Sequence, residues 1–349
     1  MSNIPTHMRA VLLTGHGDVD RLELHDDVPV PTPGPCEVLV RVSAAAVNNT
    51  DINTREGWYS KKEGAAEDAG WSGEPIEFPL IQGADACGHI VAVGDRVASS
   101  RLGERVLVEP VMREMRCEPI DPPLYFGSDR DGGFAEYTVV AARHAHKVQS
   151  EMSDVELASF PCSYSTAENL LNRSGVASGQ TVLVTGASGG VGSAAVQLAK
   201  ARGATVLAVT SESKTELVKE IGADRILLRN ENLTESIGRN SVDVVVDLVA
   251  GPSFPSLLDV LKPQGTYSVS GAIGGPLVTL DVRTLYLKDL RFLGCTVIDE
   301  DVFPKLLRRI EGGDISPLVD RTYPLERIAE AQAYFREKRH LGKIVLTLN

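Results

Sequence analysis

TVLVTGASGGVGSAAVQLAKARGA, Thr181–Ala204, is the stretch that decides the fold. It contains a short apolar run, a glycine-rich turn and an Ala-rich helical pattern in direct succession. This order distinguishes a dinucleotide site from a chance set of glycines. The glycines let the backbone approach a pyrophosphate, and the helix that begins near Gly190 points its positive dipole end at it. We therefore expect Ser188, Gly189, Gly190 and Val191 to bind a dinucleotide; a tight turn without ligand is the alternative.

The end of the next apolar run bears on which dinucleotide is bound. TVLAVT, Thr205–Thr210, is followed by SESK, residues 211–214. Sites that prefer NAD place Asp or Glu at this strand end, whereas hydroxyl groups with a lysine can hold a 2′-phosphate. We therefore expect NADPH, with Ser211, Lys214 and Arg229 near its phosphate. The glutamate within SESK speaks against this choice, and an ordinary solvated Lys214 is the alternative.

The pattern of apolar residues differs between two parts of the chain. Before about residue 153, short apolar runs broken by Gly and Pro suggest a β-rich barrel or sandwich. After it, apolar strands alternate with amphipathic helices, which is the pattern of a doubly wound parallel sheet. Asp247 ends the fourth of these strands, and Ser270, Gly271 and Ala272 end the fifth. Because ligands bind at the carboxyl ends of parallel strands, we expect these four residues to contact the cofactor.

Composition limits the class of protein. The 349 residues are 43% hydrophobic and 23% charged, as in soluble proteins long enough for two domains. A net charge of −12 argues against nucleic acid or an anionic membrane as partner, and leaves a small-molecule substrate. The first residues lack a basic start followed by an apolar run, so we expect no signal peptide, and no stretch approaches the roughly 18 apolar residues of a membrane helix. Five scattered cysteines indicate reduced thiols and a cytoplasmic protein.

Taken together, the motifs resemble the medium-chain dehydrogenase/reductase superfamily, in its quinone oxidoreductase and enoyl reductase branch. The resemblance runs almost from end to end: MRAVLL from Met8, GPCEVLVRVSAAAVNNTDINTREG from Gly34, FPLIQGADACGHIVAVGDRV from Phe78, GGFAEYTVV from Gly132, the AxGGVG turn, DVVVDLVAG from Asp243 and LGKIVLTLN from Leu341. It implies an α/β architecture in which a GroES-like β-barrel catalytic domain, residues 1–155 and 300–349, encloses a Rossmann NADP-binding domain, residues 156–299. The active site would lie in the cleft between them.

The resemblance also implies that zinc is absent. Zinc-dependent members carry a cysteine where this chain has Asn48 and a histidine where it has Ala84, and a third ligand falls near Cys162. One ligand of three cannot hold a catalytic Zn²⁺. The lobe that holds a structural zinc needs four cysteines, and that region offers Cys117 alone. We therefore expect no metal, and a packed thiol at Cys162.

The site residues implied by the resemblance fall in two groups. Asn48 and Asp51 would lie at the floor of the cleft as catalytic residues. Relatives often have a tyrosine where this chain has Asn53, so Tyr59 is the nearest replacement as proton donor, with an aromatic wall as its alternative role. The remaining residues would contact the cofactor: Thr166, Thr296, Val297, Gly342 and Lys343.

These expectations describe an NADPH-dependent oxidoreductase that transfers hydride, without zinc, to a quinone, an activated C=C of an enone or enoyl compound, or a carbonyl. Its alternatives are an NADPH-binding structural or regulatory module with little turnover, and a relative of the zinc-type alcohol dehydrogenases that has lost its metal. YFREK from Tyr334 also fits the YxxxK motif of short-chain dehydrogenases, but about 180 residues precede the glycine turn.

The last Rossmann strand could pair two copies as a homodimer. The polar insert Ser60–Phe78 is expected to be a mobile surface loop, and the sequence names no substrate.

Overall fold

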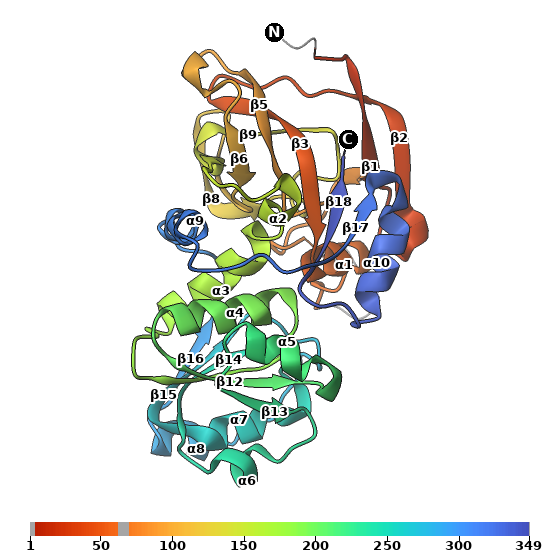
Figure 1. Cartoon of the computed structure of the whole chain (residues 1–349). Helices are drawn as coiled ribbons and strands as arrows, with labels where there is room; N and C mark the ends of the chain where they lie inside the picture. The colour runs from red at the N-terminus through yellow and green to blue at the C-terminus, as the bar shows by residue number, and fades with distance from the viewer. Residues whose placement is uncertain (1–3, 62–69, 349) are drawn as a thin grey trace. The chain divides into compact units, whose positions relative to one another are not determined.

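The computed structural model describes residues 4–61 and 70–348. The chain divides into two compact units: unit 1 is Met1–Cys162 with Pro317–Asn349, and unit 2 is Ser163–Ser316. The limits of both units differ slightly from the expected domain boundaries at residues 155 and 300. The first division falls after Cys162, and helix α9 (Val302–Gly312) belongs to unit 2. The elements of each unit are labelled in Figure 1.

Unit 2 is built on a six-stranded sheet in the order β13-β12-β11-β14-β15-β16, in which every neighbouring pair is parallel. The strands are β11 (Thr181–Val184), β12 (Thr205–Thr210), β13 (Arg225–Leu228), β14 (Val242–Asp247), β15 (Leu261–Val269) and β16 (Arg291–Gly294). Helices follow the strands: α4 (Gly190–Ala201), α5 (Thr215–Glu220), α6 (Leu233–Ile237), α7 (Phe254–Val260) and α8 (Val282–Leu287). α4 and α5 cover one face and α7 the other (Figure 1). This is the predicted doubly wound sheet.

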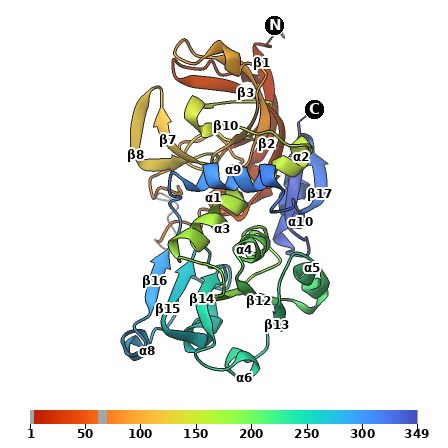
Figure 2. The same ribbon diagram turned by 60° about the vertical axis from the view of Figure 1, so that its left-hand side comes forward.

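Burial explains why the strands of unit 2 read as continuous apolar runs. A parallel sheet with helices on both faces hides both faces, so its strands do not alternate between apolar and polar residues. Val182, Leu183 and Val184 are completely buried in β11, as are Val245 and Val246 in β14. The turned view shows α4 almost along its axis, beside β12 (Figure 2). The alanines of α4 allow this close approach.

The described residues of unit 1 form three sheets. The largest has the order β10-β6-β5-β3-β18-β17, with β9 also paired to β3; β2-β1-β4 and β7-β8 are the other two. The strands are β1 (His7–Leu13), β2 (Leu22–Pro29), β3 (Glu37–Val47), β4 (Leu80–Ile81), β5 (Cys87–Val93), β6 (Arg105–Val108), β7 (Val111–Met115), β8 (Glu118–Tyr125), β9 (Tyr137–Ala141), β10 (Ala145–Lys147), β17 (Val319–Pro324) and β18 (Lys343–Thr347). Its helices are α1 (Asn49–Glu56), α2 (Asp154–Leu157) and α10 (Ile328–Arg336), while α3 (Pro161–Arg173) begins at its boundary with unit 2.

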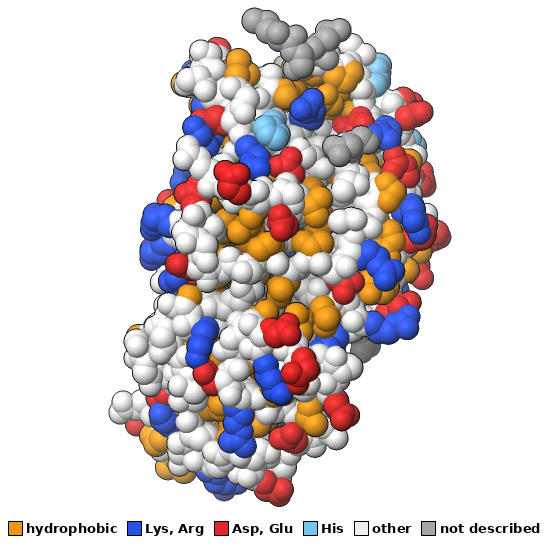
Figure 3. Space-filling view, in the orientation of Figure 1, with side chains coloured by type: hydrophobic (Ala, Val, Ile, Leu, Met, Phe, Trp, Pro, Cys, Tyr) orange, Lys and Arg blue, Asp and Glu red, His pale blue; other side chains and the backbone are white. Residues whose placement is uncertain are grey.

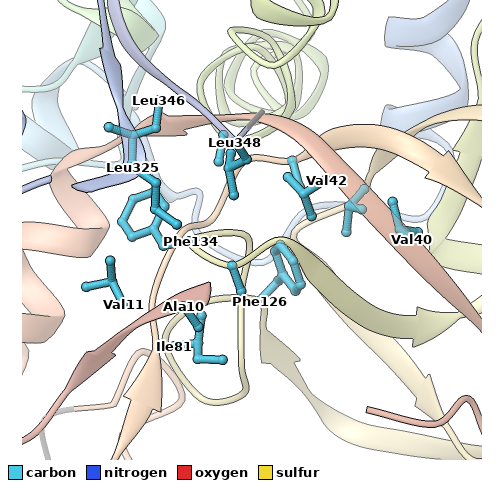
Figure 4. Close-up of a cluster of buried hydrophobic side chains, with 14 of the residues drawn as sticks. Ala10, Val11, Val40, Val42, Ile81, Phe126, Phe134, Leu325, Leu346 and Leu348 are labelled. Atoms are coloured by element: carbon cyan, nitrogen blue, oxygen red, sulfur yellow. The ribbon is translucent and has the colours of Figure 1, made fainter. Parts of the chain in front are cut away.

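Segments far apart in sequence form the centre of unit 1. β18 lies antiparallel to β3, with Val345 opposite Ala46, and parallel to β17. The strands enclose one apolar core that includes Val40, Val42, Phe126, Phe134 and Leu346 (Figure 4). Each of these five side chains is at most 2% exposed. Both ends of the chain therefore contribute to one folding unit.

The described part of the predicted insert is fastened to unit 1. Residues 62–69 lie outside the described residues, but Ser72 donates through its backbone N and its Oγ to Asp129 Oδ1, at 3.2 and 3.0 Å. The Trp71 ring packs against Tyr125, with 4.8 Å between ring centroids. The expectation of a mobile loop therefore does not hold for these residues, because a carboxylate and an aromatic ring anchor them.

The cysteines require a correction. Cys36 and Cys117 form a disulfide, whereas Cys87, Cys162 and Cys295 are buried free thiols, so the expectation of five reduced cysteines was wrong. The two bonded residues are separated by 81 positions and meet because Cys36 precedes β3 while Cys117 lies in the turn between β7 and β8. Disulfides are rare in cytosolic proteins, so this bond bears on the cytoplasmic location, which stays a prediction.

Candidate active site

The glycine turn of unit 2 has the geometry that its sequence predicts. β11 ends at Val184, and α4 begins at Gly190 with Gly189 as its N-cap. A Cβ atom at Gly192 would lie 2.1 Å from the carbonyl oxygen of Gly186, so any side chain there would displace the turn. The first N–H groups of a helix have no partner within the helix. The turn thus presents backbone donors and a helix dipole to an anion.

Asp247 fastens this turn to the neighbouring strands. Its buried carboxylate accepts hydrogen bonds from Thr185 Oγ1 at 2.6 Å, Tyr267 Oη at 2.7 Å and the backbone N of Val249 at 2.9 Å and Ala250 at 3.1 Å. Burial and the Asp247 carboxylate raise the pKa of Tyr267 well above its ordinary value, so this hydroxyl stays a donor. Asp247 was predicted to contact the cofactor; its oxygens hold the turn in shape.

The end of β12 has an unsatisfied polar group. Thr210 Oγ1 is buried and has no hydrogen-bond partner among the described residues. Ser211 Oγ lies 3.4 Å from Ser213 Oγ, and the backbone N of Lys214 donates to Ser211 O at 3.0 Å. The backbone N of Arg229 donates to Thr210 O at 3.1 Å, so residue 229 lies beside the same strand end. The backbone segments that carry Ser211, Lys214 and Arg229 therefore lie at the same strand end, and their contact with a 2′-phosphate stays a prediction.

The other predicted cofactor residues of unit 2 follow the same edge of the sheet. Ser270, Gly271 and Ala272 come directly after β15, and a Cβ atom at Gly271 would lie 2.9 Å from Leu248 O. Thr296 and Val297 follow β16. Because the strands are parallel, these segments lie at the carboxyl edge, where α/β sheets bind ligands. Asn169 of α3 was missed by sequence analysis: its Nδ2 donates to Val297 O at 3.0 Å, three residues after the predicted Thr166 on the same helix.

The site of unit 1 begins where β3 runs into α1. Asn48 is the N-cap of α1, and Asp51 is three residues further on. Asp51 Oδ2 accepts from Asn48 N at 2.7 Å, and Asp51 Oδ1 accepts from Ala84 N at 3.3 Å. The side chain of Gln82 donates to Asp51 O at 2.7 Å. These bonds join the start of α1 to the segment after β4, and they occupy both oxygens of Asp51.

A buried ion pair lies beside this cap. Lys343 Nζ donates to Asp85 Oδ2 at 2.8 Å and to Asn48 Oδ1. Asn48 Nδ2 donates to Asp85 Oδ2 at 2.8 Å and to Ala46 O at 3.2 Å. Gly342, which has φ of 72°, leads into β18, and a Cβ atom there would lie 2.4 Å from Leu318 O. The predicted residues Asn48, Asp51, Gly342 and Lys343 are therefore brought together within unit 1.

Two tyrosines and a thiol complete the cluster. Tyr59 Oη donates to Thr50 Oγ1 at 3.1 Å, in the first turn of α1. Tyr125 Oη lies 3.1 Å from Cys162 Sγ, and the backbone N of Cys162 donates to Asp85 Oδ1 at 2.6 Å. Burial, reinforced by the Asp85 carboxylate, raises the pKa of Cys162 to about 12. Such a thiol is not a nucleophile at neutral pH, in agreement with the prediction of a packed thiol.

Burial sets the electrostatics of this cluster. Asp51 is completely buried, and desolvation raises its pKa to about 7, with a further increase from Asp85. Hydrogen bonds from the backbone of Asn48 and Ala84 and the charge of Lys343 act in the opposite direction. Burial also raises the pKa of Tyr59, which keeps its hydroxyl protonated. The cluster thus contains a carboxyl that titrates near neutral pH and a hydroxyl that does not.

Asp85 and Tyr125 are the residues of this cluster that sequence analysis missed. Asp85 stands in LIQGADACGHIVAV, a mostly apolar stretch in which it is the one carboxylate. A carboxylate inside an apolar run needs a buried partner, and this signal could have pointed to a cation such as Lys343. Tyr125 gave no such signal, since an aromatic residue at the end of a strand is ordinary core.

No metal site is apparent in the part of the chain that the structure describes. Among these residues, no three His, Cys, Asp or Glu side chains gather at a spacing that could hold a metal ion. His144 and His146 instead contact the buried carboxylate of Glu109, at 3.4 and 2.9 Å. None of the described helices has the length and apolar character needed to cross a membrane.

Comparisons with known proteins agree with this architecture. Residues 34–150 match the family "Alcohol dehydrogenase GroES-like domain", and residues 190–312 match "Zinc-binding dehydrogenase". An NAD-dependent alcohol dehydrogenase of Sulfurisphaera tokodaii is 30% identical over 97% of this chain and 99% of its own length. The human quinone oxidoreductase is 28% identical over 98% of both chains. A solved structure from Sinorhizobium meliloti 1021 is 44% identical, with a TM-score of 0.92 over 100% of this chain and 99% of its own.

These matches extend along the whole chain and include both units. They exclude the short-chain alternative, because the matched families place a GroES-like domain before the dinucleotide-binding domain. An acryloyl-coenzyme A reductase of Sulfurisphaera tokodaii, 29% identical over 97% of this chain and 99% of its own, adds an enoyl reductase to the relatives. The chain therefore belongs to the medium-chain dehydrogenase/reductase superfamily, as a GroES-like and Rossmann oxidoreductase of the quinone oxidoreductase and enoyl reductase-like branch.

Proposed function

We propose that this oxidoreductase uses NADPH to reduce a quinone, an activated C=C or a carbonyl, without zinc. Relatives that include quinone oxidoreductases and an acryloyl-coenzyme A reductase support reduction of such acceptors. NAD-dependent alcohol dehydrogenases are also among them, so the choice of nucleotide has to come from this chain's own residues.

The end of β12 is the observation that carries the choice of NADPH. The buried Thr210 Oγ1 has no partner among the described residues. It is followed by Ser211 and Ser213, whose hydroxyls lie 3.4 Å apart, and Lys214 and Arg229 supply cations. An acid that binds both ribose hydroxyls would stand at this strand end in an NAD site. Here the nearest acid is Glu212, whose side chain is exposed. This donor set fits a 2′-phosphate.

The cradle for the pyrophosphate fits as well. Gly192 and Gly186 approach so closely that a side chain would fill the turn, and the N-terminus of α4 supplies the donors. When bound, the nicotinamide supplies a hydride. We propose that unit 1 supplies the rest: Asn48 and Asp51 lie at the floor of the site, and Tyr59, whose hydroxyl stays protonated, donates a proton to the reduced acceptor.

The zinc-free proposal rests on the residues that replace the family's ligands. Asn48 and Ala84 occupy two positions, and the Asn48 carbonyl oxygen already accepts from Lys343. A catalytic Zn²⁺ needs three protein ligands and an open position. Metal analysis of the purified protein should find no stoichiometric zinc, and one equivalent for each chain would overturn this part of the proposal.

Lys214→Ala tests the nucleotide. The change should raise the dissociation constant of NADPH at least tenfold and leave that of NADH nearly unchanged, because only NADPH carries the 2′-phosphate. Lys219→Ala, on the neighbouring helix α5, is the matched control, since Lys219 pairs with Glu216 at an exposed surface. Equal effects of Lys214→Ala on both nucleotides would show that the lysine does not contact the phosphate.

A turnover assay distinguishes the proposed enzyme from an NADPH-binding structural or regulatory module. Steady NADPH oxidation with a panel of quinones, enones, enoyl thioesters and aldehydes would support the proposed reaction and identify the acceptor. Tight NADPH binding without turnover on any of them would favour the structural or regulatory module. Asn48→Ala should lower the turnover number of the folded protein. Because the change also removes buried hydrogen bonds to Asp85 and Lys343, the urea midpoint should fall as well, and an unchanged rate would remove Asn48 from the site.

A small-molecule substrate and a homodimer complete the proposal. Acidic and basic side chains are interspersed on the face that Figure 3 presents, which offers no continuous basic surface for nucleic acid. β16 is an edge strand, and several large apolar side chains before and within it are exposed: Ile273, Leu277, Val282, Tyr286, Leu287 and Phe292. Leu277→Asp should halve the mass in light scattering, whereas Leu102→Asp in unit 1 should not; a monomeric wild type would refute the dimer.

A further inference from the structure

The ammonium of Lys343 is nearly sealed from solvent. The Lys343 side chain is 2% exposed and its partner Asp85 is 0% exposed. Burying a charge is unfavourable unless it is paired and hydrogen-bonded. Lys343 was expected to contact the cofactor. In the structure its ammonium donates hydrogen bonds to Asp85 and to the side-chain carbonyl oxygen of Asn48.

This arrangement fixes the orientation of the Asn48 side chain. A side-chain amide has an oxygen that accepts and an NH₂ group that donates, and either could point in a given direction. Lys343 has donors alone, so the Asn48 oxygen must face it. The Asn48 NH₂ group then donates to Asp85 Oδ2 and to Ala46 O. Asn48 is also the N-cap of α1, so its position sets where Asp51 lies.

We propose that Lys343 is a positioning residue of this active site, which acts through Asn48 and Asp85 rather than by touching the substrate. Its ammonium holds the Asn48 amide in one orientation and balances the charge of Asp85 beside Asp51. The inference rests on the proposed function for its effect on turnover, but its effect on Asp51 does not depend on that function.

Charge balance around Asp51 follows from the same contacts. The groups that face Asp51 are Asp85 on the same segment as Ala84, Lys343 from β18, Tyr59 after α1 and Cys162 at the start of α3. Asp85 raises the pKa of Asp51 and Lys343 lowers it. Removing the ammonium should therefore raise the pH at which Asp51 loses its proton, and removing the Asp85 charge should lower it.

A simpler reading is that Lys343 and Asp85 are an ordinary buried ion pair. Removing one partner of such a pair is strongly destabilising, whereas replacing both by neutral groups can be neutral. The two interpretations differ in what the double replacement restores. An ion pair with a purely structural role predicts that activity returns together with stability. The positioning role predicts that stability returns while the Asn48 amide, without its donor, remains misplaced.

Four proteins test the proposal: the wild type, Lys343→Met, Asp85→Asn and the double variant. Arg113→Met is the matched control, because the half-buried Arg113 pairs with the buried Glu109 at 2.9 Å elsewhere in unit 1. For each protein we would measure the urea midpoint, the turnover number and KM with the best acceptor, and the titration of the Asp51 carboxyl by ¹³C NMR, assigned through Asp51→Asn.

The expected pattern is specific. Lys343→Met should raise the Asp51 midpoint by about one pH unit or more, Asp85→Asn should lower it, and the double variant should lie near the wild type. The double variant should recover the urea midpoint yet keep a turnover number at least about tenfold below the wild type, with KM changed less than about threefold. Arg113→Met should lose stability and keep its turnover number.

Two results would overturn the inference. One is a turnover number in the double variant within about twofold of the wild type, which would make the pair structural. The other is an Asp51 midpoint that does not move in Lys343→Met or, if that variant does not fold, in Asp85→Asn. Absence of turnover in the wild type would refute the proposed function instead, and the Asp51 titration would then decide the positioning role alone.

Discussion

Asp51 should make the stability of the folded chain depend on pH in an unusual direction. Its pKa is raised from 3.8 to about 7, because the carboxyl is completely buried. The folded chain therefore holds this proton more tightly than the unfolded chain. Between these two values stability falls as the pH rises, and the loss is complete above pH 7. Carboxylates that are paired with a cation or accept several hydrogen bonds in the folded state have lowered pKa values and give the opposite slope.

The magnitude follows from the width of that window. From pH 5 to just above the folded pKa of about 7, the wild type should lose about 2–3 kcal/mol through Asp51, at about 1 kcal/mol or slightly more for each pH unit. Asp51→Asn removes this dependence. The substitution also places an NH₂ group near a backbone N–H donor, which adds a loss of stability that does not vary with pH.

Urea unfolding at pH 5, 6, 7 and 8 measures the effect. The free energy of unfolding of Asp51→Asn relative to the wild type should rise by about 2–3 kcal/mol over this range. Glu156→Gln is the control: hydrogen bonds from Ser153 lower the pKa of Glu156, so that carboxyl stays ionised throughout. A difference between Asp51→Asn and the wild type that stays flat with pH would show that Asp51 is ionised in the folded chain, and the assigned electrostatics would be wrong.

The remaining predictions concern the glycine turn and the disulfide. Gly192→Ala should destabilise the chain by about 1–3 kcal/mol and weaken NADPH binding, since its Cβ atom would lie 2.1 Å from Gly186 O. Gly189→Ala, whose Cβ atom would lie 3.5 Å from the same oxygen, should be tolerated in the same urea and binding assays. Cys36→Ser should lower the free energy of unfolding by about 4–5 kcal/mol, because the bond to Cys117 closes a loop of 81 positions. The loss should vanish when both proteins are unfolded in dithiothreitol; a loss that persists there would be due to the substitution and not to the bond.

Local sequence patterns were enough to predict the sheet of unit 2. Strands buried on both faces are apolar throughout. In the helices between them apolar residues recur about every 3.6 residues, and the glycine turn marks the first connection from a strand to a helix. All three signals lie within short windows. In unit 1, by contrast, the central pairing of β3 with β18 joins residues about 300 positions apart. No short window contains that information, and it came from the resemblance alone.

The candidate site shows the same limit at the level of single residues. Asn48 and Asp51 stand on one turn of helix, so their proximity could be predicted. Asp85 lies in the connection between β4 and β5 and Lys343 begins β18, so their pairing with each other depends on tertiary structure. The Cys36–Cys117 bond was missed for the same reason, because neither cysteine belongs to a recognisable spacing. What the sequence could not reveal was which buried polar groups are partners.

The pairing of β18 with β3 also sets an order of events during synthesis. Unit 2 lies in one continuous segment, Ser163–Ser316, so all of its strands have been made before β18 leaves the ribosome. Asp85 is made early and has no ammonium to pair with until Lys343 follows, and β3 lacks one of its neighbours for the same time. A nascent chain can thus complete unit 2 first. Until β18 is synthesised, the N-terminal part of unit 1 remains incompletely folded, and the unpaired edge of β3 is exposed to chaperones.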